Sequence, residues 1–284
     1  MIDTDVAMTD PCKVVLLATD GSEFSAGVES VGLELAQHSQ SHLHMLRLLL
    51  AEPGTDASIV EEQDANLKLD QIANQCLAAG IEHTRMIRPA EDPTTGILTA
   101  AREINAQLVI VGRRGRRGLA KNNVGEATTK LLDKLECSVL VVPRLFSFWS
   151  SGVLLVIDPD ETAGDQAALV AIRLAHGANI PLTILLVVDE KDEACRDANL
   201  TVNRLVALAQ LHGVTAEGLV HGGDLDEVVL EVARQRSDDL IVCEPRDRSM
   251  FDRLFNINDL VKLIGKANCP VLVVKGTHNK TDQA

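Results

Sequence analysis

The chain is predicted to be an α/β protein built from two tandem five-stranded parallel-sheet α/β sandwiches. Three observations support this prediction. Short runs of aliphatic residues alternate with segments of helical periodicity, this order occurs twice, and aromatic residues make up only 2% of the 284 residues. Strands that crossover helices bury on both faces read as continuous branched-aliphatic runs, so each half fits a parallel, doubly wound sheet.

The elements of the first half follow from local patterns. The first predicted strand, 14–18, is an apolar run that ends at the polar turn Thr19-Asp20-Gly21-Ser22. Apolar residues then recur at helical spacing, which predicts a helix over 24–38. The later predicted strands are 42–50, 82–87, 108–111 and 139–142, and the later helices are 60–79, 95–105 and 126–135. Gly80 gives a helix-ending signal, and Pro143 closes the last strand.

The second half repeats this order. Its predicted strands are 153–157, 182–188, 215–220, 240–242 and 271–274, and its helices are 166–176, 198–212, 226–236 and 258–266. Two matches set the register between the halves, because 107–111 aligns with 239–242 and 137–142 aligns with 269–274. The predicted domains are therefore 1–146 and 147–284.

The stretch 144–152 between the domains holds Phe146, Phe148 and Trp149, which are half of the aromatic residues. A free linker would be polar. We therefore expect these rings to pack on the seam between the halves, and an exposed surface for a partner is the alternative.

Composition limits the classes of partner. The net charge of −14 favours a soluble protein and disfavours nucleic acid or an anionic membrane as a general partner. The N-terminus lacks the pattern of a secretory signal, and no apolar run approaches the ~20 residues that span a bilayer. The six cysteines form no CxxC pair and suit reduced, buried thiols. We expect a cytoplasmic protein without membrane insertion.

The most informative motif is a glycine- and arginine-rich loop between a buried strand and a helix. It reads Gly112-Arg113-Arg114-Gly115-Arg116-Arg117-Gly118, and Gly125 opens the helix that follows. Glycines let backbone N–H groups approach a ligand closely, and a helix start carries partial positive charge. The loop therefore predicts an anion site, and a nucleotide phosphate is the anion that fits it best.

With this loop, the chain resembles the universal stress protein family over nearly its whole length, as two tandem copies. Nucleotide-binding members of that family carry Gly, two residues, Gly, nine residues and then Gly followed by Ser or Thr. Here Gly112 and Gly115 are followed by nine residues and Gly125, but Glu126 replaces the hydroxyl residue. The turn that begins at Asp20 and the strand that Pro143 closes also match the family.

The resemblance implies a Rossmann-like fold with an ATP or ADP site in the first half, which Mg²⁺ would accompany. Asp20 would lie beside the adenine and ribose, and Leu48, on the second strand, would offer its backbone to the base. The other implied contacts come from the loop and the start of the next helix; they are Gly112, Arg113, Gly115, Gly125, Glu126 and Ala127. No catalytic residue and no metal ligand is assigned.

Glu126 is the main departure from the family pattern. A carboxylate at this position favours its own helix start but repels a polyphosphate. At about 4 Å and an effective dielectric constant of about 20, one such repulsion is roughly 4 kcal/mol before screening. Nearby basic residues would offset this repulsion, or one of them would pair with Glu126 and fill the site internally; they are Arg113, Arg114, Arg116, Arg117 and Lys121.

The second half has lost the glycines of the loop. Cys243 stands where Gly112 does, Arg246 where Gly115 does, Asn256 near the position of Gly125 and Ile257 near that of Glu126. Acidic residues crowd the same strand ends, so we expect no phosphate site there; they are Asp158, Asp160, Glu244 and Asp247. In the family, two domains often pair through their last strands. We expect an intramolecular pseudo-dimer of this kind, with a homodimer as a further alternative.

The sequence favours a binding or signalling module of the stress response over an enzyme, because no Ser/His/Asp or Cys/His arrangement and no Walker lysine is apparent. Two alternatives stay open. One is slow ATP hydrolysis or self-phosphorylation that uses Asp20 and a metal. The other is a nucleotide-independent scaffold that binds a protein or a small apolar ligand. Structural roles are favoured over metal binding for His42 and His44, and over redox sensing for Cys137 and Cys269.

Overall fold

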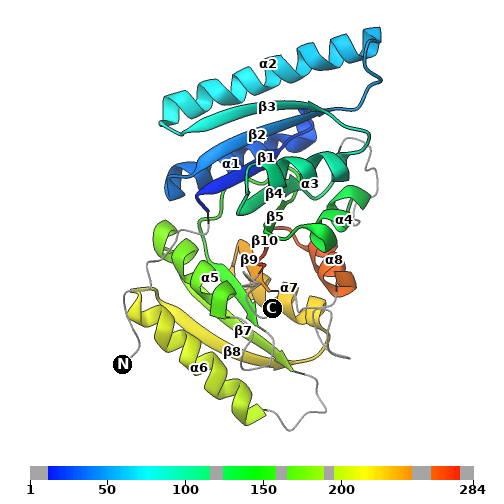
Figure 1. Ribbon diagram of the computed structural model, residues 1–284. Helices are drawn as coiled ribbons and strands as arrows, with labels where there is room; N and C mark the ends of the chain where they lie inside the picture. The colour runs from blue at the N-terminus through cyan, green and yellow to red at the C-terminus, as the bar shows by residue number, and fades with distance from the viewer. Residues whose placement is uncertain (1–11, 116–123, 158–164, 189–194, 245–256, 276–284) are drawn as a thin grey trace, which may run out of the picture.

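A computed structural model describes residues 12–115, 124–157, 165–188, 195–244 and 257–275, with only the backbone at 195–197. Its ten strands form one sheet in the order β3-β2-β1-β4-β5-β10-β9-β6-β7-β8 (Figure 1). The α/β prediction is confirmed, and the two five-stranded halves are joined edge to edge.

The first half contains five strands and the helices between them. The strands are β1 (Val14–Ala18), β2 (His42–Leu49), β3 (His83–Pro89), β4 (Leu108–Gly112) and β5 (Ser138–Val142). The helices are α1 (Ala26–Ser39), α2 (Asp56–Ala79), α3 (Pro93–Glu103) and α4 (Glu126–Lys134), and a short 3-10 turn, Glu23–Ser25, precedes α1.

The second half has the same order of elements. The strands are β6 (Val153–Ile157), β7 (Leu182–Val188), β8 (Ala216–Gly222), β9 (Leu240–Cys243) and β10 (Val271–Val273). The helices are α5 (Asp165–Ala178), α6 (Cys195–Leu211), α7 (Leu225–Arg236) and α8 (Ile257–Lys266). Among the described helices, none is long and apolar enough to cross a membrane.

The largest difference from the predicted boundaries is at α2, which begins four residues before the predicted start at 60. The side chain of Thr55 accepts a hydrogen bond from the backbone N–H of Ser58 and so caps the helix. The first turn, Asp56-Ala57-Ser58-Ile59, is mostly exposed and lacks apolar residues at helical spacing, so apolar periodicity does not detect it.

Helices cover both faces of the sheet. One hydrophobic core joins α1, α2, α5 and α6 to the alternate strand residues on one face, and a second core joins α3, α4, α7 and α8 to the other face. Successive strand residues point to opposite faces, so the unbroken aliphatic runs supply both cores at once.

The two halves meet where β5 pairs with β10, and this pair is antiparallel whereas the other strand pairs are parallel. Leu140 pairs with Leu272, and Val139 pairs with Val273. Leu140 and Leu272 are also equivalent in the alignment of the two halves, so a local two-fold axis passes through their pair. The pairing satisfies backbone groups that an open edge would leave exposed.

The segment between the domains packs on the seam, as its aromatic residues predict. Trp149 is 2% exposed and stacks on Phe148 with ring centroids 4.0 Å apart. A Cβ added to Gly27 of α1 would lie 2.9 Å from the carbonyl oxygen of Pro143 and 3.0 Å from backbone atoms of Phe146. The segment is therefore in close contact with the first half.

Candidate functional site

The strand order places the candidate site at the carboxyl ends of β1 and β4. These strands are neighbours in the sheet, and the helices that follow them, α1 and α4, cover opposite faces. In parallel sheets a crevice for ligands opens at such a reversal. Asp20 follows β1 and Gly112 ends β4, so both predicted residues lie at this crevice.

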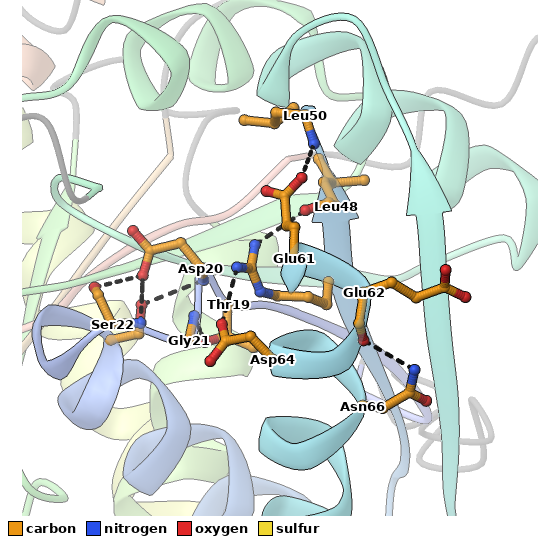
Figure 2. Close-up of polar contacts among 12 residues, drawn as sticks. Thr19, Asp20, Gly21, Ser22, Leu48, Leu50, Glu61, Glu62, Asp64 and Asn66 are labelled. Atoms are coloured by element: carbon orange, nitrogen blue, oxygen red, sulfur yellow. Dashed lines mark hydrogen bonds and ion pairs between the residues drawn. The ribbon is translucent and has the colours of Figure 1, made fainter. Parts of the chain in front are cut away.

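The turn after β1 holds the carboxylate of Asp20 in one orientation. One carboxylate oxygen, Oδ1, accepts hydrogen bonds from the backbone N–H of Ser22 at 3.0 Å and from the Oγ atoms of Ser22 and Ser25 (Figure 2). Gly21 has φ +70°, which an L side chain rarely adopts. The other oxygen, Oδ2, lies 3.4 Å from where a Cβ would stand on Gly115. Asp20 and Gly115 therefore lie next to each other at the carboxyl ends of β1 and β4.

A buried polar chain supports this turn from below. Lys68 pairs with Glu29 at 2.8 Å, and the hydroxyl of Thr19 donates to Glu29 at 2.7 Å. The same hydroxyl oxygen accepts a hydrogen bond from the backbone N–H of Gly21 at 3.0 Å. Because Lys68, Glu29 and Thr19 satisfy one another's polar groups, the turn is well supported in this conformation.

Leu48 lies where its backbone can face the crevice. The carbonyl oxygen of Leu46 accepts a hydrogen bond from Thr19, the residue that follows β1. Leu48 is two residues further along β2, so its backbone groups point to the same side, beyond the end of β1. This placement suits the implied contact with a base.

Arg47 is a residue of this site that the sequence analysis did not single out. Arg47 is 5% exposed as a residue, and its guanidinium donates to the carbonyl oxygen of Leu48 at 3.0 Å and lies 3.5 Å from a carboxylate oxygen of Asp64. Its Nε has no hydrogen-bond partner in the described part of the chain. The available signal was a single charged residue in an otherwise apolar stretch of β2. Arg47 therefore already donates to the backbone of Leu48, the group that the family resemblance implies for the base.

The two ends of the glycine loop are joined at its base. The backbone N–H of Gly125 donates to the carbonyl oxygen of Arg113 at 2.9 Å, and the hydroxyl of Thr128 donates to that of Gly112 at 3.0 Å. Gly125 is the N-cap of α4, and no side chain caps this end of the helix. The first-turn amides, including those of Glu126 and Ala127, therefore retain the partial positive charge of a helix start. Residues 116–123, with Arg116, Arg117 and Lys121, lie outside the described residues.

The side chain of Arg113 contacts the second half of the chain. Its NH1 nitrogen donates to the carbonyl oxygens of Ile264, Gly265 and Ala267, at 3.2, 3.2 and 2.7 Å. These carbonyls lie at the C-terminal end of α8, where a cation is favourable. Burial lowers the pKa of Arg113 from its ordinary value, and the neighbouring Arg114 adds to this effect. Arg113 thus joins the base of the glycine loop to the other domain.

Glu126 turns toward solvent and pairs within its own helix. Its side chain is 82% exposed, and one carboxylate oxygen lies 2.6 Å from Nζ of Lys130. The hydrogen bond and the charge of Lys130 lower the pKa of Glu126. The described partner of Glu126 is therefore a residue of α4, and the carboxylate does not fill the crevice.

In the second half, Glu244 and not Cys243 stands where Gly112 does, because Val111 and Cys243 pair with the equivalent residues Val141 and Val273 of the last strands. The prediction for Cys243 is therefore wrong by one residue. The carboxylate of Glu244 accepts a hydrogen bond from the backbone N–H of Ala167, in the first turn of α5, at 3.4 Å. Cys243 is fully buried, and burial raises the pKa of its thiol to about 12. A carboxylate therefore already occupies the start of α5, the counterpart of the helix that follows β1 in the first half. The predictions for Asp158, Asp160, Arg246, Asp247 and Asn256 lie outside the described residues.

The histidines and cysteines that the sequence analysis considered are packed as structural residues. His42 and His44 stack with ring centroids 4.4 Å apart, and Nε2 of His42 lies 2.8 Å from the hydroxyl of Thr84. Within the ranges that the structure describes, no group of three His, Cys, Asp or Glu side chains could hold a metal ion. Burial raises the pKa values of Cys137 and Cys269 to about 11 and about 12, so neither is a reactive thiolate near neutral pH.

Comparison with known proteins shows the family. A sequence model described as the universal stress protein family matches residues 11–143 and 152–275, so the chain belongs to that family in two tandem copies. The universal stress protein YxiE of Bacillus subtilis is 27% identical over 143 residues, which cover 45% of this chain and 97% of that protein. Universal stress protein Sll1388 of Synechocystis is 28% identical over 149 residues, covering 45% and 96%.

The fold of the whole chain also has a solved counterpart. The crystal structure of a universal stress protein from Archaeoglobus fulgidus covers 93% of this chain and 97% of its own, with a TM-score of 0.74 and 19% identity. This likeness supports the tandem Rossmann-like architecture and extends to the fold alone.

Proposed function

We propose that the first half binds ATP or ADP in the crevice between β1 and β4, and that the protein acts as a nucleotide-responsive module of the stress response. The observation that carries this proposal is that the oriented carboxylate of Asp20 and the glycine loop at Gly115 lie close together at the ends of β1 and β4, on the same chain segment that leads to the uncapped start of α4. The oriented carboxylate suits ribose hydroxyls, and the helix amides suit phosphates, with Mg²⁺ as an accompanying ion.

Some members of the family carry nucleotides. A universal stress protein from Archaeoglobus fulgidus was solved in complex with dAMP, and another universal stress protein in complex with cAMP. For the present chain, the proposal rests on its own residues. The charge of Glu126 is directed to solvent and paired with Lys130, which reduces the repulsion expected from that carboxylate.

The chain offers one candidate site rather than two. The glycines at the β4 end are retained as Gly112 and Gly115, whereas Cys243 and Glu244 stand at the β9 end. A stoichiometry of one nucleotide per chain is therefore expected. Binding beside Gly112 and Gly115 would act on Arg113, which contacts α8, so the second half would respond to the nucleotide bound by the first.

The test is isothermal titration calorimetry with ADP and ATP, with and without Mg²⁺, on the full chain. Gly115→Val places a branched side chain between the loop and Asp20, and should weaken binding at least about tenfold, or ~1.4 kcal/mol. The matched control is Gly177→Ala on α5, where an added Cβ meets nothing within 4 Å. The proposal fails if the folded parent protein takes up no nucleotide at millimolar concentration.

A further inference from the structure

In the proposed nucleotide site, the strand order decides which strand end would face the base. The strands β2, β1 and β4 are consecutive in the sheet, Asp20 follows β1, and the uncapped start of α4 follows β4. With the phosphates at α4 and the ribose at Asp20, the base is at the opposite end of the nucleotide. It would therefore lie over the carboxyl end of β2.

At its carboxyl end, β2 extends beyond β1. The ladder between the two strands ends where Ala18 pairs with Leu46, and the N–H of Thr19 donates to the carbonyl oxygen of Leu46. The N–H and carbonyl of Leu48 are the next backbone groups on that side, where β1 has ended. Such a donor and acceptor match the edge of adenine, whose ring nitrogen accepts and whose amino group donates.

The side chain of Arg47 already uses the acceptor of this pair. Its NH1 nitrogen donates to the carbonyl oxygen of Leu48 at 3.0 Å, and the residue is 5% exposed. Its Nε lies 3.4 Å from where a Cβ would stand on Gly21, so the guanidinium lies between the turn after β1 and the end of β2. It thus offers an N–H donor to Leu48 at the place where an amino group of the base would offer one.

A second side chain satisfies the backbone just beyond Leu48. One carboxylate oxygen of Glu61, on α2, accepts hydrogen bonds from the N–H groups of Leu50 at 2.8 Å and Ala51 at 2.9 Å (Figure 2). Side chains of this chain therefore satisfy several polar groups at the end of β2 before any ligand is bound.

The packing of the fold does not require an arginine at position 47. The two halves pair their first and second strands in the same register, so the counterpart of His44 is Thr183 and that of Arg47 is Leu186. Leu186 is fully buried in the hydrophobic core. An aliphatic side chain therefore suits this place in the fold, and the guanidinium has a use other than packing.

From these observations we propose that Arg47 is a specificity-determining residue that makes the nucleotide site indifferent to the amino group of a purine. The guanidinium donates to the carbonyl oxygen of Leu48 in place of that amino group, so the amino group adds no affinity. The ligand class is then purine ribonucleotides as a group, including those without the amino group, and not adenine nucleotides alone. This inference rests on the proposed nucleotide site and adds its base preference.

The test compares ADP with purine riboside diphosphate, which differs from ADP only in lacking the amino group. Calorimetry on the full-length parent protein should give dissociation constants within about twofold of each other, because the carbonyl oxygen of Leu48 is already occupied. This comparison needs no substitution, so it does not depend on how well a variant folds.

Arg47→Leu frees the carbonyl oxygen and copies the residue of the second half. This variant should bind ADP about fivefold more tightly than purine riboside diphosphate, which is the effect of one hydrogen bond. The matched control is Arg88→Met on the neighbouring strand, where the guanidinium is about half exposed and pairs with Glu103, and it should behave as the parent does. Far-UV circular dichroism and the thermal midpoint establish that both variants are folded.

Two outcomes would overturn the inference and leave the nucleotide site in place. One is a parent protein that already binds ADP about fivefold more tightly than the analogue, and the other is a folded Arg47→Leu protein that binds the two ligands equally. If neither protein takes up either ligand at millimolar concentration, the nucleotide site itself is refuted and the base preference with it. Failure of the base preference is therefore distinguished from failure of the site.

Discussion

Replacing Arg113 by Met removes the charged contact between the glycine loop and α8 while keeping the aliphatic stem. One guanidinium nitrogen, NH1, serves the carbonyl oxygens of Ile264, Gly265 and Ala267, and the contact at 2.7 Å is the shortest. A hydrogen bond to a charged group contributes about 1.5–3 kcal/mol, and a cation at a helix C-terminus about 0.3–1 kcal/mol. Because a single NH₂ group has two hydrogens to share among three acceptors, the loss should total about 2 kcal/mol rather than three full bonds.

The assay is urea unfolding at neutral pH, followed by Trp149 emission and by far-UV circular dichroism. Arg113→Lys retains the charge but not the planar fork, so its stability should lie between those of the parent and Arg113→Met. Arg88→Met is the matched control, because Arg88 pairs with Glu103 on the surface, where both side chains are about half exposed, and should change stability by about 0.5 kcal/mol or less. If Arg113→Met is as stable as Arg88→Met, the contact with α8 does not hold the halves together.

Two further predictions concern buried charged groups. Arg47→Met removes the guanidinium that donates to the carbonyl oxygen of Leu48. Calorimetry should therefore show tighter binding of ADP, which has a base, and unchanged binding of ribose 5-triphosphate, which has none. Equal changes for both ligands would refute a role for Arg47 at the base. Burial raises the pKa of Asp238 to about 6, above the value of about 3.9 in the unfolded chain. The native state therefore binds the carboxyl proton of Asp238 more tightly than the unfolded state does. As pH rises from 4 to 6, the free energy of unfolding falls because the buried carboxylate must ionise. The stability of Asp238→Asn relative to the parent, from urea unfolding at each pH, should therefore increase by about 2 kcal/mol between pH 4 and pH 7, and a constant difference would contradict the raised pKa.

Much of the architecture is visible in the sequence because its causes are local. Val153–Ile157 and Leu182–Val188 are strands with the predicted bounds, since an unbroken branched-aliphatic run suits only a strand covered on both faces. Apolar periodicity does not predict the start of α2, because Thr55 caps a mostly exposed first turn without that periodicity. The nucleotide site itself remains a prediction for which the geometry at Asp20 and Gly115 is suitable.

Local sequence patterns did not predict which groups the site side chains contact. Arg113 was expected to face a phosphate through its place in the loop, and its guanidinium instead reaches carbonyls that lie 151–154 positions away in the chain. Such a partner follows from the antiparallel pairing of β5 with β10, which brings α4 and α8 together. The sequence around Arg113 does not indicate a contact with α8, and the sequence around α8 does not indicate a contact with Arg113.

The sequence by itself determined the tandem α/β fold, the family, and the presence of a glycine loop in the first half only. These properties depend on hydrophobic periodicity and on the positions of glycines, and both can be read directly from the order of residues. The tertiary structure alone decided that Arg47 lies over Leu48, that Arg113 caps α8, and that a cavity forms between α1 and α5. Those features depend on how distant segments pack, because burial and close contact are properties of the folded chain and not of any short stretch of it.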